Sequence, residues 1–177
     1  MVDLLKFNAK ICYTAAGVLF YQDKILLIKH KKLGFWLPPG GHIEPDELAH
    51  EAAEREFLEE TGIRVKTMKT GFVIDDKLTQ FFPAPINANL HWISKENYEF
   101  RISGKARSEK TKKDWSKGCE QHYNLLFLVE PVDGVKFKQN IEETEGIAFF
   151  GLDELDEIEI PEHIKKEIKF AFNYAKN

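Results

Sequence analysis

The sequence predicts a single domain of the α/β class, and three observations support this. At 177 residues the chain can bury one sizeable core and leaves little room for a second. Apolar segments of strand length recur between residues 14 and 152. Helical patterns occur among these segments and again at the end of the chain. We therefore expect one domain over residues 1–177.

The composition is that of an ordinary soluble globular protein. Hydrophobic residues make up 43% and charged residues 31% of the chain. The formal net charge of −4 provides no global basic field that would attract nucleic acid. The longest apolar runs, such as 125–129, are far shorter than the roughly 18 residues of a membrane span. The first residues, MVDLLKFNAKIC, lack the pattern of a signal peptide, so we expect a cytoplasmic protein with no membrane partner.

Several segments have the pattern of β-strands. The first two, AAGVLFY and KILLIKH within residues 14–30, are joined by a predicted turn at Gln22-Asp23. The Gly- and Pro-rich segment 31–44 predicts a structured loop. Further strands are predicted at 63–74, 88–93, 122–130 and 146–152.

Two segments have the pattern of helices. The first begins near Glu47, after Pro45-Asp46, and ends at Thr61-Gly62, where the glycine suits the left-handed position just beyond a helix end. The second begins near Pro161. Its residues 164, 168 and 172 are apolar at intervals of four, which predicts a stripe that faces the core.

The two cysteines, Cys12 and Cys119, are far apart in the sequence and form no CxxC pair. In a reducing cytoplasm, this spacing favours two free thiols over a disulfide or a metal site. We therefore expect both cysteines to be unpaired.

A basic segment at about 95–118 interrupts the strand pattern. Residues 95–117 include eight Lys or Arg and four acids, a local charge of +4, together with three aromatic residues. The segment is interpreted as a solvated insertion loop or as a lid whose cations meet a polyphosphate. Nucleic-acid binding is the weaker interpretation, because the patch is short and the rest of the chain is acidic.

The predicted helix that begins near Glu47 carries three acids on one face. With about 100° per residue, Glu56, Glu59 and Glu60 fall within an arc of about 100°. Like charges at these spacings repel one another and destabilise a helix. A bound divalent cation reverses that effect, and carboxylate oxygens suit Mg²⁺ or Mn²⁺. The alternative for each acid taken singly is a solvated surface position.

Other residues of this region suit a supporting role. Arg55 lies four residues before Glu59, at a spacing that lets its guanidinium orient a carboxylate. Glu47 is interpreted as a helix cap, a loop tether or an additional metal ligand. Gly40 and Gly41 allow close approach of the backbone, and a carbonyl there could complete a metal shell.

Residues 41–63, GHIEPDELAHEAAEREFLEETGI, resemble the Nudix box, G-x5-E-x7-R-E-U-x-E-E-x-G-U with U apolar. All nine specified positions fit, and the probability of a chance match at a given start is on the order of 10⁻⁹. The loop FWLPPGG at 35–41 resembles the family's entry to the box, with two prolines where one is usual. The stretch ETEGIAFFGLDEL at 143–155 resembles a later family segment.

The resemblance implies an α/β/α sandwich around a mixed β-sheet, with the box as a loop–helix–loop catalytic motif. It also implies Mg²⁺-dependent attack of water on a diphosphate, with Mn²⁺ as a substitute, in nucleoside diphosphate-X substrates. Glu56, Glu59 and Glu60 would then be the principal metal ligands, supported by Arg55. The implied set of metal ligands also includes the Gly40 carbonyl and Glu47.

The general base and the substrate stay open. Glu56 is one candidate base, and Glu145 is another, together with its neighbours at 142 and 143, although three acids there also suit a solvated turn. Aromatic residues outside the box are candidates for stacking on a substrate, although each is more often part of a core. These candidates are Trp36, Phe72, Phe82, Trp92 and Trp115.

Two functions compete at this point. The first is an active Nudix pyrophosphohydrolase that acts on a small nucleotide-type molecule such as a nucleoside triphosphate, ADP-ribose or a dinucleoside polyphosphate. The second is a nucleotide-binding regulatory module that keeps the fold without turnover. The intact set of box acids favours the enzyme. A homodimer is compatible with the sequence, because small enzymes often associate symmetrically, but no segment identifies an interface.

Overall fold

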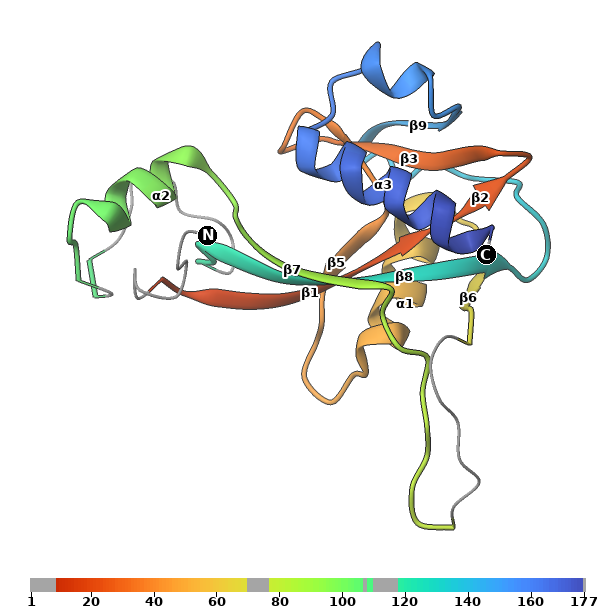
Figure 1. Ribbon diagram of the computed structural model, residues 1–177, viewed down its shortest axis with the longest axis horizontal. Helices are drawn as coiled ribbons and strands as arrows, with labels where there is room; N and C mark the ends of the chain where they lie inside the picture. Colours follow the sequence, from red (N-terminus) through yellow and green to blue (C-terminus); the bar gives the residue numbers. More distant parts are fainter. Residues whose placement is uncertain (1–8, 70–76, 107, 110–117, 177) are drawn as a thin grey trace.

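The computed structural model describes residues 9–69, 77–106, 108–109 and 118–176. Its strands form two β-sheets, and its helices flank them (Figure 1). The strands are β1 (Ile11–Val18), β2 (Phe20–Tyr21), β3 (Lys24–His30), β4 (Trp36–Leu37), β5 (Gly40–His42), β6 (Val65–Thr67), β7 (Asn87–Trp92), β8 (Gln121–Pro131) and β9 (Thr144–Phe150). The α-helices are α1 (Ala49–Thr61), α2 (Lys95–Ile102) and α3 (Glu162–Ala175), and a 3-10 turn spans Glu154–Asp156.

The larger sheet is mixed, as predicted. Its strand order is β5-β1-β8-β6, and β7 also pairs with β8. Strands β1 and β8 are parallel, whereas the β5–β1, β6–β8 and β7–β8 pairs are antiparallel. The smaller sheet, with the order β2-β3-β4 and β9 paired with β3, is antiparallel throughout.

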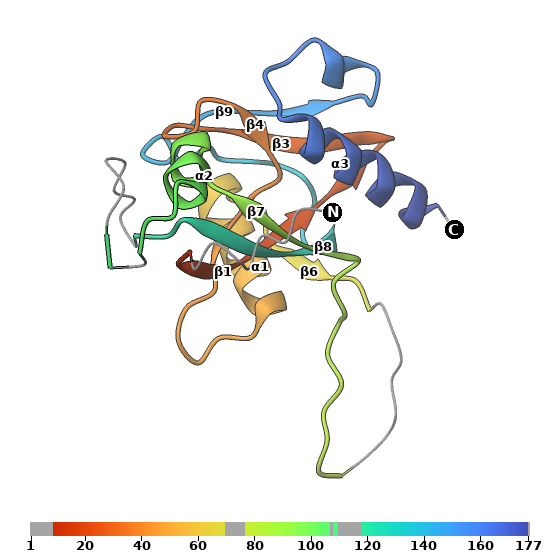
Figure 2. The ribbon, with the colours of Figure 1, turned by 60° about the vertical axis from the view of Figure 1, so that its left-hand side comes forward.

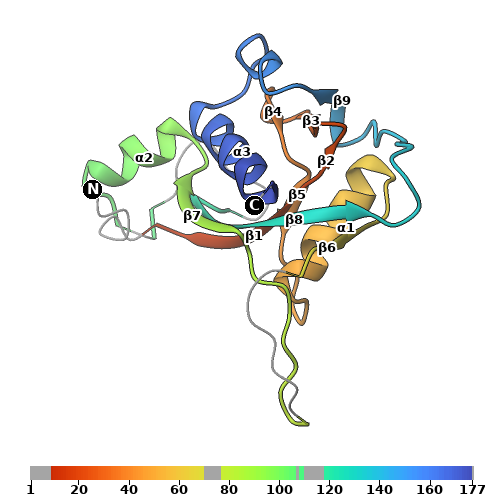
Figure 3. The ribbon, with the colours of Figure 1, turned by 45° about the vertical axis from the view of Figure 1, so that its right-hand side comes forward.

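Helices cover the two faces of the larger sheet. Residues 125–129 of β8 form a continuous apolar run, as expected for a strand segment that packs on both faces. Phe127 packs in one core cluster with Phe57 of α1. Leu126, one residue earlier and therefore on the opposite face, packs in a second cluster with Ile168 of α3. Helices α1 and α3 thus lie on opposite sides of the sheet (Figures 1 and 3), which confirms the predicted α/β/α sandwich.

The smaller sheet belongs to the same two cores. Leu26 of β3 packs with α1, whereas Ile25 and Leu27 pack with α3, so β3 is buried on both faces. Strands β3 and β9 run together beside α3 (Figure 2). The turn between β2 and β3 has positive φ at Gln22 (52°) and Asp23 (59°), as a two-residue hairpin turn requires. The predicted turn is therefore confirmed.

The helices begin and end close to their predicted positions. Helix α1 begins at Ala49 and ends in Gly62, which has φ of 73° and donates its N–H to the Leu58 carbonyl at 2.7 Å. Helix α3 begins directly after Pro161. Among the described residues, no helix combines the length and the apolar character that crossing a membrane requires.

Two segments differ from their predictions. The predicted loop 31–44 contains β4 and β5, because its short extended stretches find main-chain partners on β3 and β1. The predicted strand 63–74 is reduced to β6 at Val65–Thr67, and residues 70–76 lie outside the described part of the chain.

The prediction of two free thiols is wrong. Cys12 and Cys119 form a disulfide that joins residues 107 positions apart, with the Cα atoms separated by 5.7 Å. The parallel pairing of β1 with β8 explains the contact, because Cys12 lies opposite His122 and Cys119 precedes β8 by two residues. Sequence spacing carries no information about such a long-range pairing.

The basic segment is partly helical and holds a buried ion pair. Helix α2 carries Arg101, whose side chain is 2% exposed and donates to the carboxylate of Glu120 at 2.6 and 2.8 Å. The same guanidinium donates to main-chain carbonyls in the segment that follows α2. Arg101 therefore secures the chain after α2 and is not available to meet a ligand. Residues 107 and 110–117 lie outside the described residues.

Candidate active site

Arg55 organises the acids of α1. Its guanidinium makes two hydrogen bonds to the Glu47 carboxylate, at 2.7 and 3.0 Å. It also donates to Glu56 at 2.9 Å and to Glu59 at 3.1 Å. The planar fork of an arginine fixes carboxylates in this way, and the positioning role of Arg55 in catalysis stays a prediction. Glu47 also accepts from the main-chain N–H of Glu44 at 3.0 Å, which tethers the loop before the helix.

Two of the box acids are shielded from solvent, Glu60 fully and Glu56 partly, with its side chain 15% exposed. Glu60 is 3% exposed, and burial raises its pKa to about 8, with Glu56, Glu143 and Glu59 adding repulsion. The N–H of Gly40 is the partner that opposes this rise, at 2.9 Å from the carboxylate. Burial also raises the pKa of Glu56, although Arg55 partly opposes it. The side chain of Glu59 is 52% exposed.

Strand β5 places its main chain against these acids. Gly40 donates its N–H to Glu60, and the carbonyl of His42 accepts from Arg55 at 3.0 Å. A Cβ at Gly41 would overlap the Glu56 carboxylate, and a Cβ at Gly40 would overlap the backbone of β1. The close approach predicted for both glycines is therefore confirmed.

A cavity of about 910 Å³ opens beside the acids. Its lining includes Glu56, Glu60 and Glu143. Residues of β1, β5, β7 and β8, residues of α2 and α3, and several residues between positions 30 and 38 also line it. A volume of this size accommodates a nucleotide-sized ligand next to the carboxylates.

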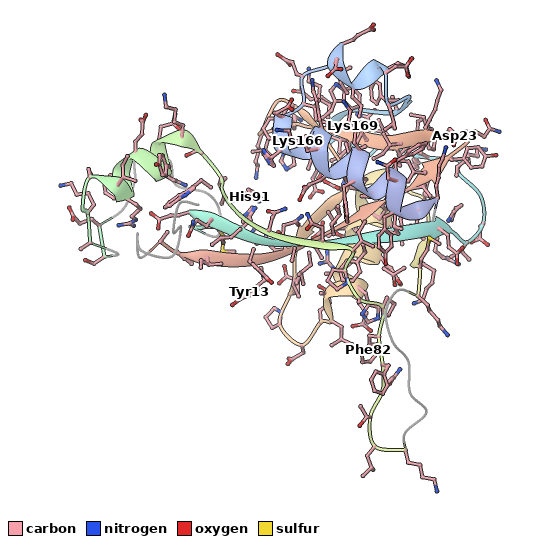
Figure 4. The ribbon with its side chains drawn as sticks, viewed as in Figure 1. Tyr13, Asp23, Phe82, His91, Lys166 and Lys169 are labelled. Atoms are coloured by element: carbon pink, nitrogen blue, oxygen red, sulfur yellow. A yellow bond between two sulfur atoms is a disulfide. The ribbon has the colours of Figure 1, made fainter. Side chains whose placement is uncertain are left out.

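Polar side chains of the larger sheet form the floor of this cavity. The strand registers place Thr14 opposite His42 and Asn124, and place His122 opposite His91. All five line the cavity, because side chains at paired positions share a face. Figure 4 shows His91 on the α3 side of the sheet. Tyr13, which directly precedes Thr14 on β1, lies on the other side.

Two histidines of the floor, His91 and His122, are neutral near pH 7. Burial lowers the pKa of His91 to about 4 and that of His122 to about 3. His163 of α3 adds to the lowering at His91, with the two ring centroids 5.7 Å apart. The imidazoles of His91 and His122 therefore offer hydrogen-bonding groups to the cavity without adding positive charge.

The structure separates the candidate acids near β9. Glu143 lines the cavity and raises the pKa values of Glu56 and Glu60 electrostatically. Glu145 is exposed and lies outside the cavity lining, because it is the extra residue of a β-bulge where β9 pairs with Lys29 and His30.

Two of the three predicted stacking residues that the structure describes lie away from the cavity. Trp36 packs edge-on against Phe150 at 4.8 Å between ring centroids, within the α3-side core. Phe82 lies on the long loop before β7 and stacks on His50 (Figure 4). Trp92 does line the cavity, whereas Phe72 and Trp115 lie outside the described residues.

Sequence reasoning missed the histidines and asparagines of the floor. The alternation of polar residues at 89 and 91, and at 122 and 124, was a usable signal, because residues two apart on a strand share a face. That signal does not show which strands are neighbours, so it could not have defined the cavity.

The fold and the carboxylate site together define a hydrolase-type Nudix architecture, and comparison with known proteins agrees. The family model described as NUDIX domain matches residues 13–171. The chain therefore belongs to the Nudix family, and the predicted family is confirmed.

Individual relatives match over shorter stretches. A Lactococcus lactis protein named "Probable DHNTP pyrophosphohydrolase" is 32% identical over 96 residues, covering 54% of this chain and 55% of that protein. The human 8-oxo-dGDP phosphatase NUDT18 is 38% identical over 63 residues, covering 33% of this chain and 20% of that protein. The chain thus spans about half or less of the length of these curated relatives.

A solved structure extends the likeness across the fold. A NUDIX-family hydrolase from Clostridium perfringens superposes with a TM-score of 0.66 at 23% identity, covering 92% of this chain and 97% of that one. This similarity supports the sandwich architecture.

Proposed function

We propose that the protein hydrolyses the diphosphate linkage of nucleoside diphosphate-X compounds, giving a nucleoside monophosphate and phosphorylated X. The observation that carries the proposal is a pair of carboxylates, the buried Glu60 and the partly buried Glu56, which both line a nucleotide-sized cavity. Water attacks one phosphorus, and the P–O bond to the other phosphate breaks.

The acids fit a divalent cation. Three box carboxylates and the nearby Glu143 gather with one arginine among them, and the pKa of Glu60 is about 8 because its ionised form lacks compensation. Mg²⁺ or Mn²⁺ held by Glu56, Glu59 and Glu60 would supply that compensation, with Glu47 and the Gly40 carbonyl as additional candidate ligands. Such a cation, when bound, neutralises diphosphate charge and lowers the pKa of a coordinated water.

The chain's own groups have distinct tasks in this proposal. Arg55 holds the carboxylates in position, and the Gly40 N–H fixes the orientation of Glu60. Glu143 is the better placed candidate for the general base, because it lines the cavity whereas Glu145 does not. Glu56 also stays a candidate.

The substrate is proposed only as a class. Two of the relatives are named for DHNTP and 8-oxo-dGDP, which both carry a diphosphate linkage. Trp92 and Tyr98, in edge-on contact at 5.6 Å, offer aromatic surface in the cavity for the rest of such a molecule. We propose no role in nucleic-acid binding. The proposed cytoplasmic location and the homodimer stay predictions.

The test is a phosphatase-coupled assay of Mg²⁺-dependent turnover over nucleoside triphosphates, oxidised guanine nucleotides, ADP-ribose, dinucleoside polyphosphates and nucleotide sugars. We expect one class to stand out and its turnover to fall by at least about 100-fold in Glu59→Gln and Glu60→Gln. Glu51→Gln is the matched control, because Glu51 lies on the same helix and contacts the Leu48 N–H, outside the cavity. Nucleotide binding without turnover at any metal concentration would establish the regulatory module instead.

A further inference from the structure

A cluster of soft ligand atoms lies at the end of the cavity floor remote from α3. It consists of Cys12, His42 and Cys119, whose sulfur and imidazole nitrogen atoms all lie within 4.8 Å of one another. His42 Nε2 is 3.3 Å from the sulfur of Cys119. His42 and Cys119 also line the cavity.

The sheet fixes the positions of these residues. Cys12 and His42 lie on β1 and on β5, which pair in register. Cys119 lies just before β8, the parallel neighbour of β1. Two of the three residues therefore lie on hydrogen-bonded strands, and the third lies two residues before one.

The cluster is chemically distinct from the carboxylate site. Thiolate and imidazole ligands select zinc and related soft cations, whereas carboxylates select Mg²⁺. The two sites share His42, which contributes its side chain to the cluster and its carbonyl to Arg55. Each site can therefore be removed by substitutions that leave the side chains of the other in place.

We propose that reduction of the Cys12–Cys119 disulfide creates a zinc-type metal site with Cys12, His42 and Cys119 as ligands. An external dithiol supplies two electrons and two protons, so the S–S bond breaks, two thiols form and the dithiol becomes a disulfide. A divalent zinc ion then displaces both thiol protons and forms two metal–sulfur bonds and one metal–nitrogen bond. The proposal is independent of the hydrolytic function.

The distances suit this ligand set. Tetrahedral zinc with bonds of about 2.3 Å to sulfur and about 2.0 Å to nitrogen places these atoms about 3.5 Å apart, close to the 3.3 Å between Cys119 and His42. Two ligating sulfurs lie about 3.8 Å apart around such an ion, a separation that side-chain rotation provides from Cα atoms 5.7 Å apart.

An imidazole without a hydrogen-bond partner among the described residues lies beside His42. His122 is the register partner of Cys12, and its ring is 5.1 Å from the ring of His42 between centroids. Its buried Nε2 has no hydrogen-bond partner among the described residues. A buried nitrogen without a hydrogen-bond partner destabilises a folded protein. A metal ion bound in the cluster would give the His122 nitrogen a partner and remove that destabilisation.

The experiment measures metal binding without substrate, in the Glu60→Gln background with excess Mg²⁺ so that the carboxylates do not contribute. Protein is reduced with a phosphine, freed of reductant under anaerobic conditions and titrated with Zn²⁺ against a chromophoric chelator. We expect one Zn²⁺ per chain, bound at least about 100-fold more tightly than by the oxidised protein. Titration with Co²⁺ should give thiolate-to-cobalt charge-transfer absorption and the visible bands of a tetrahedral site.

Variants complete the test. His42→Ala and Cys119→Ser should each lose at least about 100-fold in zinc affinity, compared with the reduced parent. His163→Ala is the matched control, because His163 also lines the cavity but lies on α3, outside the cluster. Equal zinc affinity of the oxidised and reduced proteins, or of His42→Ala and its parent, would overturn the proposal. Absence of the thiolate-to-cobalt absorption would overturn it without any variant.

Discussion

Replacing Glu60 with glutamine should stabilise the metal-free protein at alkaline pH while it removes activity. The glutamine keeps an oxygen that accepts the Gly40 N–H, so the structural contact survives. What changes is the charge that the wild-type protein must bury above the pKa of Glu60.

The magnitude follows from the pKa of Glu60. In the folded chain it rises from 4.5 to about 8, chiefly through burial. Each pKa unit corresponds to about 1.36 kcal/mol, so ionised Glu60 costs the folded protein about 5 kcal/mol once the pH is well above 8. The pKa of Glu60 is higher in the folded protein than in the unfolded chain. The folded protein therefore avoids this cost below about pH 4.5, where Glu60 is protonated in both states, and loses the corresponding stability as the pH rises through 8.

The assay is urea denaturation of the oxidised protein in EDTA at pH 5, 6.5, 8 and 9. The wild type should lose up to about 1.4 kcal/mol of unfolding free energy per pH unit relative to Glu60→Gln. Added Mg²⁺ should narrow the difference at pH 9, because a cation bound to the folded wild type stabilises it. Parallel pH profiles for the two proteins in EDTA would refute the reasoning.

Three further predictions concern other parts of the molecule. Gly41→Ala should lower kcat at least about tenfold in steady-state kinetics, because the added methyl displaces the Glu56 carboxylate; unchanged kcat would show that the overlap is relieved. Arg101→Met should lower the unfolding free energy by about 3 kcal/mol in denaturant titrations, because it leaves its carboxylate partner buried alone; a loss below about 1 kcal/mol would contradict this. Glu143→Gln should reduce kcat more than Glu145→Gln under the same Mg²⁺ concentration, and the reverse order would restore Glu145 as the candidate base.

The carboxylate site was predictable from sequence because it is local. The acids at 56, 59 and 60 and Arg55 lie on one helix, where the helical period alone fixes which side chains meet. The glycines before the helix were equally readable, because only glycine permits the approach seen between Gly41 and Glu56.

The cavity floor was not predictable for a matching reason. Its residues come from four strands, and their neighbours depend on pairings between β1 and β8 that span more than a hundred residues. The same pairing brings Cys12 to Cys119. At β9 a single bulge residue decides that Glu143 and not Glu145 lines the cavity, and alternation along the sequence cannot reveal a bulge.

Strand β5 contacts the carboxylate site through its main chain and the cavity through a side chain. The contacts of Gly40 and His42 to Glu60 and to Arg55 come from main-chain atoms, and a change of the side chain at position 42 leaves the His42 carbonyl in place. The side chain at position 42 meanwhile faces the cavity. A library randomised at this one position should therefore alter which molecules the cavity accepts, while the carboxylates that carry out the chemistry keep their arrangement.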